Sequence, residues 1–321
     1  DVYKRQGKMM CIKERNASDS TCKKLLRDKG CFADLCNYAF FQGRQVIQPE
    51  ELVSRENDLS TLIGKVDKPT EIKRYRDVVR KASIHGEYVI IGVEHQSTFD
   101  EKMIFRILNY DATIYINQVE SKQEVYPVGS FVFYTGDKEW KSPETLKETL
   151  KNIPPEMEPY INDWRLPVVE LKTMDARKLT NQRLKEVVEI SQSMFAGNYD
   201  NLRNNRKIET ENFMMAATFT RTKIKRGDLP EGDEINMCEA MDRLFQRFEN
   251  QGMEKGMEKG ETIGFEKGKS DTLKDLLKVK LGTLSRPLEK QLTNTSLEKL
   301  NELTLNIFNV TSEEDVLRII N

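Results

Sequence analysis

Apolar residues follow two different periods along the first half of the chain, and each period predicts an element. Residues 23–41 carry apolar side chains at spacings of three and four and are followed by Gly43, which predicts one helix. Residues 88–96, Tyr-Val-Ile-Ile-Gly-Val-Glu-His-Gln, are typical of a central strand that is covered on both faces. The β-forming residues of 71–84, followed by turn residues at 85–87, predict that this strand is the second arm of a hairpin.

The segments that follow alternate between the same two patterns. Helical spacing predicts a helix over 99–120, and short apolar runs predict strands over 128–134 and 166–171. Ser142, followed by proline, is typical of the N-cap of a short helix between these two strands. The order predicts an α/β fold over 20–175, with a mixed central sheet flanked by helices.

Beyond residue 175 the pattern is helical, and no segment after Leu179 alternates as a strand does. We therefore expect a helical extension over 176–250 and a helical tail over 271–321. Between them, residues 251–270 continue a run in which glycine recurs at every fourth position. Each glycine costs a helix about 1 kcal/mol. This segment is therefore either a helix whose small residues let a partner backbone approach closely, as in a homo-oligomer, or a flexible charged linker.

Composition limits the class of protein. Hydrophobic residues make up 38% of the chain and charged residues 32%, which is typical of a soluble globular protein. No apolar stretch approaches the roughly 20 residues that a membrane helix needs, so we expect no membrane partner. The five cysteines match no zinc-binding pattern and favour reduced thiols in the cytoplasm. Residues 1–19 are expected to be an N-terminal remnant or disordered.

The small number of histidines limits which metal sites and catalytic groups the chain can form. With only His85 and His95 in the chain, a His-rich zinc site and a Ser-His-Asp triad are both disfavoured. A metal would then be held mainly by carboxylate and other oxygen atoms, which indicates a hard ion such as Mg²⁺. The net charge of −1 does not decide the partner, because a DNA-binding protein needs only a local basic face.

One group of polar residues at the end of the central strand could carry such chemistry. Glu94 and Gln96 are two positions apart, so they share one face of the strand while the side chain of His95 points to the other. Asp77 lies on the preceding candidate strand, where pairing would bring it beside Glu94, and the backbone carbonyl of His95 is a natural third ligand. A metal held there would activate water and stabilise charge on a phosphate. The alternative is an ordinary ion pair at the end of a strand.

Several segments, taken in order, carry a family resemblance. They are residues 32–41, 45–52, 73–78, 91–97 and 103–112. This set resembles the recombination-promoting nuclease and putative transposase family, a branch of the PD-(D/E)XK nucleases, and the resemblance extends from about Phe32 to Asn250. It implies a restriction-endonuclease-like core and Mg²⁺-dependent hydrolysis of phosphodiester bonds in DNA, in an endonuclease associated with recombination or transposition.

The resemblance also assigns roles to residues. Asp77 matches the first metal carboxylate, Glu94 the acid of a Glu-x-Gln element, and Gln96 its last position, so these three form the expected catalytic set. Gln96 replaces the lysine of the wider superfamily, and a neutral amide can orient water or phosphate but supplies no positive charge. One alternative is therefore a weak or inactive nuclease fold that binds DNA and assembles through its helical tail. Another is a tail that binds a partner or holds the core inactive.

Further residues are candidates for supporting roles. Asp34 matches an acidic position of the family and would reach the metal through a water molecule, or else is an ordinary helix acid. Arg106 and Tyr110 are four apart on one helix face, where they would contact phosphate or brace the site. A basic cluster is expected to contact DNA, unless it is a solvated helix end. Its members are Arg203, Arg206, Lys207, Arg221, Lys223, Lys225 and Arg226.

Overall fold

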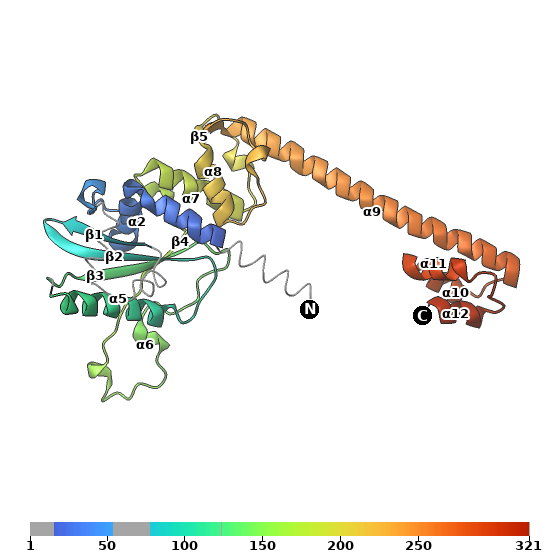
Figure 1. Cartoon of the computed structure of the whole chain (residues 1–321), viewed down its shortest axis with the longest axis horizontal. Coiled ribbons are helices and arrows are strands. Elements are labelled where there is room, and N and C mark those ends of the chain that lie inside the picture. Colours follow the sequence, from blue (N-terminus) through green and yellow to red (C-terminus); the bar gives the residue numbers. More distant parts are fainter. Residues whose placement is uncertain (1–15, 54–77, 123, 321) are drawn as a thin grey trace. The chain divides into compact units, whose positions relative to one another are not determined.

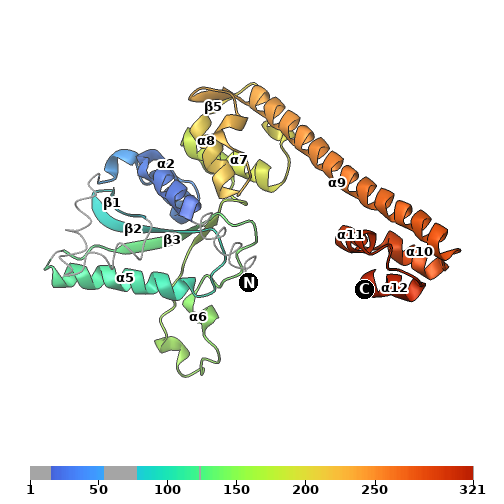
Figure 2. The same cartoon turned by 45° about the vertical axis from the view of Figure 1, so that its right-hand side comes forward.

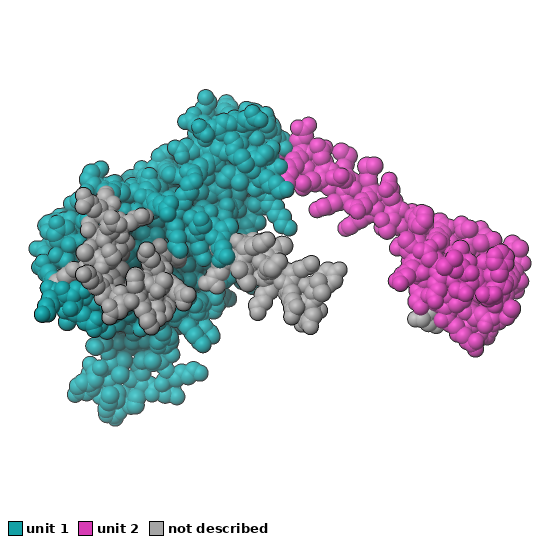
Figure 3. Space-filling model, in the orientation of Figure 1, with its two compact units in different colours: residues 1–243 teal, residues 244–321 magenta. Residues whose placement is uncertain are grey.

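The computed structural model describes residues 16–53, 78–122 and 124–320. The chain forms two compact units, residues 1–243 and 244–321, which are coloured separately in Figure 3. The boundary falls within the helix α9 (Met237–Leu281). Residues 71–77 of the predicted first strand, Asp77 among them, lie outside the described residues.

A four-stranded mixed sheet lies at the centre of the first unit, in the order β1-β2-β3-β4. β1 (Val78–Ile84) pairs antiparallel with β2 (Glu87–Gln96), while β3 (Val128–Tyr134) runs parallel to β2 and pairs in parallel with β4 (Val168–Glu170). The predicted mixed α/β architecture is therefore confirmed, and β3 has the bounds that the sequence indicates.

The turn between β1 and β2 explains why the hairpin closes at the predicted residues. His85 and Gly86 both have positive φ angles, 54° and 86°. A two-residue turn of this kind has a backbone twist that matches the twist of the paired strands. The hairpin register, with Ile84 opposite Glu87 and Val78 opposite Val93, follows from this turn.

Different helices cover the two faces of the sheet (Figures 1 and 2). Odd-numbered residues of β2 and β3, such as Val93 and Phe133, pack with α2 (Lys29–Phe41) and α7 (Gln182–Phe195). Even-numbered residues of β3, namely Val132 and Tyr134, pack against α5 (Met103–Glu120) on the opposite face. Burial on both faces accounts for the nearly continuous apolar run of β2.

Two expected helix boundaries were wrong because of capping residues. Residues 16–27 are helical, and α2 is a separate helix whose N-cap Asp28 accepts a hydrogen bond from the backbone N–H of Cys31 at 2.8 Å. Residues 16–19, which were expected in the N-terminal remnant, belong to the first of these helices. The short helix α6 (Leu146–Thr149) is capped by Thr145 instead of Ser142.

The expectation of an all-helical extension was also wrong. After Leu179 the chain forms a two-stranded antiparallel sheet from β5 (Lys207–Glu209) and β6 (Glu234–Asn236), followed by α8 (Thr210–Phe219) and α9 respectively. Each strand has three residues with one buried isoleucine, which is too short to show strand alternation in a sequence. Single 3₁₀ turns occur at Pro49–Glu51, Glu158–Tyr160, Ala176–Lys178, Asp200–Leu202 and Arg226–Asp228.

The second unit consists of helices only within its described residues, 244–320. The glycine-periodic segment is helical within α9, which ends before Gly282 at a φ of 87°. The end of α9 packs with α10 (Arg286–Thr293), α11 (Leu297–Leu305) and α12 (Glu313–Ile320) around a core of leucines. In the part of the chain that the structure describes, no helix is both long and apolar enough to cross a membrane.

This leucine core predicts a contrast between two neighbouring residues of α9. Leu277 is fully buried in the core, whereas Leu276 is 48% exposed. We expect Leu277→Ala to lower the free energy of unfolding of this unit by about 2–4 kcal/mol, because the truncation leaves a cavity. Leu276→Ala, the matched control, should cost much less. Urea denaturation followed by far-UV circular dichroism would measure both, and equal losses would contradict the packing described here.

Candidate functional site

Three polar residues at the end of β2 point alternately to the two faces of the sheet. Glu94 and Gln96 are buried, at 5% and 3% exposure, and the Gln96 side-chain amide donates a hydrogen bond to Oε1 of Glu94 at 3.3 Å. His95 faces the other way, where its Nδ1–H donates to Oδ1 of Asp19 and its Nε2 lies 2.8 Å from the hydroxyl of Thr135. The predicted division of these side chains between the two faces is what the structure shows.

Arg106 of α5 connects Glu94 to the loop that follows β2. Its Nη2 donates to Oε1 of Glu94 at 3.0 Å, and its Nη1 donates to Oδ2 of Asp100 at 2.8 Å. Its Nε donates to the hydroxyl of Tyr110 at 3.4 Å, one turn further along the same helix. The face shared by Arg106 and Tyr110 therefore points at the strand end, where the guanidinium group lies between two carboxylates.

The surroundings of Arg106 keep its side chain charged. Burial disfavours the charged form, but hydrogen bonds to Tyr110 and Asp100 and the charge of Glu94 outweigh this effect and raise the pKa of Arg106 above its ordinary value. The side chain is still 35% exposed, so the ion pair lies at the rim of the site. Glu94 thus has a permanent cation beside it.

The neighbouring strands add further polar groups at the same end of the sheet. Gln96 pairs with Tyr134 of β3, which pairs with Glu170 of β4. Burial raises the pKa of Tyr134, and the charge of Glu170 raises it further, while the charge of Arg221 lowers it. Arg221 also donates from Nη2 to the backbone carbonyl of Ser97 at 3.1 Å, immediately after β2. A cation from the segment after α8 therefore reaches the candidate site.

The residues described at this strand end supply part of a metal site. The Glu94 carboxylate and the Gln96 amide oxygen are donors of the kind that Mg²⁺ prefers. Among the described residues, however, no group of three or more His, Cys, Asp or Glu side chains could hold a metal ion. Asp77, the other predicted carboxylate, lies outside these residues, although β1 begins at Val78 and pairs it with Val93, the neighbour of Glu94.

The structure does not bring Asp34 together with Glu94. Asp34 is 2% exposed and accepts hydrogen bonds from the backbone N–H groups of Thr180 and Asn181, both at 2.8 Å. The Thr180 hydroxyl and the side-chain amide of Gln45 also donate to it, at 3.1 and 3.0 Å. Asn181 is the N-cap of α7, so these contacts join α2 to the start of α7. All of these donors belong to that junction and none to the end of β2.

The residues of the predicted basic cluster contact different partners in different parts of the first unit. Arg203 pairs with Asp242, Arg206 pairs with Glu189, and Arg226 donates to backbone carbonyls at Pro230 and Gly232. Lys207, Lys223 and Lys225 are exposed. Of this cluster, Arg221 is the residue with a hydrogen bond to the end of β2. Its φ of 56° places it in the left-handed region, a conformation that no sequence pattern here indicates.

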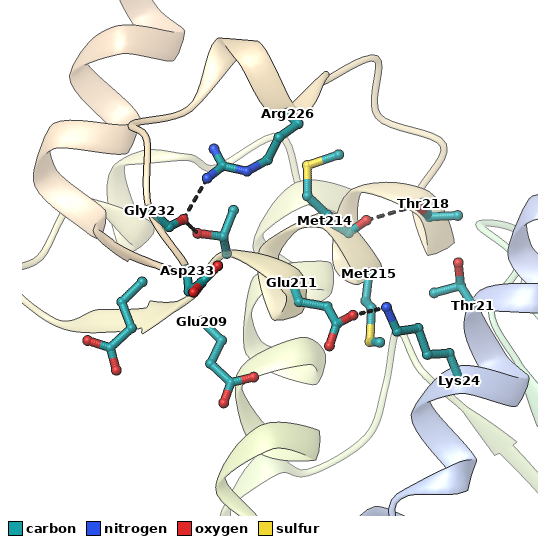
Figure 4. Close-up of a pocket in the computed structure, with 12 residues that line it drawn as sticks. Thr21, Lys24, Glu209, Glu211, Met214, Met215, Thr218, Arg226, Gly232 and Asp233 are labelled. Carbon is teal, nitrogen blue, oxygen red and sulfur yellow. Dashed lines mark hydrogen bonds and ion pairs between the residues drawn. The ribbon is translucent and has the colours of Figure 1, made fainter.

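A separate cavity of about 720 Å³ lies between residues 16–27, α8 and the β5–β6 segment (Figure 4). Carboxylates outnumber cations in its lining, and Lys24 is paired with Glu211. Arg226 donates its hydrogen bonds to backbone carbonyls at the edge of the cavity. An excess of negative charge repels phosphate, so this cavity is a poor site for nucleic acid. The carboxylates that line it are Glu209, Glu211, Asp233 and Glu234.

Comparison with known proteins gives one finding. A family model described as "Putative transposase, YhgA-like" matches residues 70–217, which include the whole sheet, α5 and α7. No curated protein matches the chain, and no solved structure matches it. The matched region includes Glu94 and Arg106.

The hydrogen bonds of Asp34 predict a structural role that can be separated from any role at a metal. Asp34→Asn replaces one of two acceptor oxygens by an NH2 group, so whichever way the amide is turned two of the present donors lose their acceptor, and we expect a loss of about 1–3 kcal/mol in the free energy of unfolding. Asp137→Asn is the control, since Asp137 is 73% exposed and pairs only at the surface with Lys172. Chemical denaturation would compare the two. Unchanged stability of Asp34→Asn together with weakened metal binding would instead support an accessory role at the metal.

Proposed function

We propose that this protein is a Mg²⁺-dependent DNA endonuclease that hydrolyses phosphodiester bonds in recombination or transposition. The observation that supports this most strongly is a buried carboxylate, Glu94, at the end of the central strand, with Gln96 and Arg106 hydrogen-bonded to the same oxygen. A buried carboxylate is costly unless it is paired or serves a site. The match of residues 70–217 to a transposase family supports DNA as the substrate.

The chemistry we propose divides between a metal and the side chains. Asp77, Glu94 and the backbone carbonyl of His95 would hold Mg²⁺, which when bound supplies Lewis acidity and lowers the pKa of water. The Gln96 amide orients the attacking water or the phosphate. Arg106, beside Glu94, favours the negative charge that develops on the phosphate oxygens.

We further propose that Arg221 is the first phosphate contact outside this centre. Its guanidinium donates a hydrogen bond to the backbone carbonyl of Ser97, the residue after Gln96, so it lies beside the proposed centre. An arginine can donate to phosphate from more than one nitrogen, which suits it to guide a DNA backbone. The exposed side chains of Lys223 and Lys225, which follow it in sequence, would extend this contact.

Plasmid nicking by the full chain tests the proposed activity. Wild-type protein should nick DNA with Mg²⁺ and not with EDTA, and Asp77→Ala and Glu94→Ala should each lower the rate at least about a hundredfold, as expected when a metal carboxylate is lost. Lys102→Ala, an exposed residue at the start of α5, serves as the control and should keep the wild-type rate. Equal nicking by all variants would mean that the activity comes from another site or from a contaminant.

A second function is favoured by a specific observation. The carboxylate of Glu94 is ion-paired with Arg106, as in a purely structural contact, and Gln96 brings no charge to the strand end. The protein would then bind DNA and assemble on it through its helical tail without cutting it. Folded wild-type protein that binds DNA in a salt-dependent way, yet does not nick it with Mg²⁺, would establish this function in place of the first.

We also propose that the chain forms a homo-oligomer through its C-terminal helices. Residues 250–264 of α9 are exposed, and the positions of added Cβ atoms at Gly252, Gly256 and Gly260 meet no other atoms within 4 Å. Met253 and Met257, next to these glycines, are exposed as well. A helix with this many glycines gains most of its stability from packing, and the glycine stripe would let a second α9 approach closely.

Bulky residues on the glycine stripe test this pairing. Gly256→Leu combined with Gly260→Leu should raise the dissociation constant of the oligomer about tenfold or more, because overpacking an interface costs about 1–3 kcal/mol. Glu258→Leu is the matched control, since it adds the same side chain to the opposite side of the helix. Sedimentation equilibrium would measure all three proteins. An unchanged constant in the double variant would show that the stripe is not the contact.

A further inference from the structure

We infer that the outer face of α5 is a contact between two copies of this chain, which pair through this helix in antiparallel orientation about a two-fold axis near Ala112. The contact is separate from the one proposed for α9, and it depends neither on a metal nor on nuclease activity. All of the residues that carry it belong to α5 and its two ends, within the described range 78–122.

α5 carries apolar residues on two sides, and the chain covers one of these sides. Met103 and Ile107 are buried in the core that α5 shares with β3. On the outer side, Phe105, Ile116 and Val119 are 46%, 55% and 61% exposed. With 3.6 residues per turn, these three positions fall on one face of the helix. A continuous apolar stripe at the surface is typical of a site where another molecule packs.

The outer face of α5 also lacks charge, although 32% of the chain is charged. Within Met103–Glu120, Asp111 is buried and accepts a hydrogen bond from Ser130, and Arg106 is directed at Glu94. A face without cations does not suit DNA, whereas depletion of charge is typical of the core of a protein–protein interface. The exposed residues of this face between its two ends are Phe105, Asn109, Ala112, Tyr115, Ile116 and Val119.

The charges at the two ends of this face fit a second copy of the same helix. Lys102 precedes α5 and Glu120 ends it, and both are exposed. They are 18 positions apart, which is about five turns, so they lie on the same flank of the helix. In an antiparallel pair, Lys102 of each copy would meet Glu120 of the other. A parallel pair would instead bring like charges together, so the antiparallel direction is favoured.

The apolar positions have the same centre as the charges. Phe105 and Val119 each lie seven positions from Ala112, and Lys102 and Glu120 lie ten and eight positions from it. Phe105 of one copy would therefore pack on Val119 of the other. In a two-fold contact the residue nearest the axis meets itself, and the small side chain of Ala112 would let the two helices approach closely there.

This contact and the candidate site use different sides of α5. Arg106 and Tyr110 are hydrogen-bonded to each other, and Arg106 is directed at Glu94 and Asp100. The pairing uses none of these side chains. Each copy in the dimer therefore keeps its own candidate site, and the two sites are related by the two-fold axis.

Sedimentation equilibrium of the full chain carrying Gly256→Leu and Gly260→Leu tests this contact without the one proposed for α9. We expect a monomer–dimer equilibrium in this background. Ala112→Arg should raise its dissociation constant at least about tenfold, because two like charges would meet at the axis. Ala17→Arg is the matched control, since Ala17 is also an exposed alanine on a helix, and it should stay within about twofold. Far-UV circular dichroism would verify that each variant is folded.

Two outcomes of this measurement would overturn the pairing. One is a monomer at every concentration, which would assign the face to a different protein, and the other is an equal constant with and without Ala112→Arg. If the contact proposed for α9 is wrong, the two leucines change nothing, and the test of α5 still holds. Failure of one proposal is therefore distinguishable from failure of the other.

Reversal of the end charges tests the antiparallel direction. Lys102→Glu and Glu120→Lys should each raise the dissociation constant about threefold or more, because each variant places like charges together twice in the dimer. The two changes combined should restore the constant to within about twofold of the background. A merely structural effect of one substitution would not be reversed by the other. A double variant that stays as weak as the single variants would refute the antiparallel pairing.

Cross-linking gives a second measurement at the axis itself. Ala112→Cys treated with a short bismaleimide should give a covalent dimer, because the two introduced thiols lie next to each other. Ala17→Cys, and the same chain without an added cysteine, should stay largely monomeric under the same conditions. Equal cross-linking of all three proteins would contradict a two-fold axis near Ala112.

Discussion

The structure depends on one constraint, the enclosure of β2 on both edges and both faces. β1 and β3 hydrogen-bond to its two edges, α2 and α7 cover one face, and α5 covers the other. A strand in this position can carry polar side chains only where each of them finds a partner. Its last three residues are polar, and they divide between the two faces of the sheet. The candidate site consists of these three residues and the side chains that form hydrogen bonds or ion pairs with them.

The buried polar side chains have different kinds of partner on the two faces of the sheet. His95 is held by Asp19 and Thr135, which ties the helix of residues 16–27 to the sheet. Glu94 is held by Arg106 of α5, whose side chain is partly exposed while that of Glu94 is buried. The partners of His95 therefore join one helix to the sheet, whereas the partner of Glu94 lies at the partly exposed rim of the opposite face. The tail does not share this constraint, because its leucine core is formed within the second unit.

The sequence could predict those features that depend on periodicity over several residues. The hairpin follows from β-forming residues around a turn, the bounds of β3 from an apolar run, and the common face of Glu94 and Gln96 from strand alternation. The break at Asp28, the three-residue strands around Ile208 and Ile235, and the partners of the basic cluster do not. A single capping residue or a three-residue strand is too short to show a periodic pattern. The basic cluster, in turn, gives no information in the sequence about which acidic residues lie next to it in the fold. Asp100 was missed for a related reason, since its role arises only from the position of Arg106.

The contacts of Asp34 have a consequence for the order in which the chain acquires its structure during synthesis. Its donors at Thr180 and Asn181 are 146 and 147 residues away. Until that part of the chain has left the ribosome, a buried carboxylate on α2 would lack two backbone partners, which opposes closure of the core. Chain synthesis at roughly 5–20 residues per second makes this delay about 7–30 seconds long. The junction between α2 and the start of α7 is therefore completed late, after most of the first unit has been made.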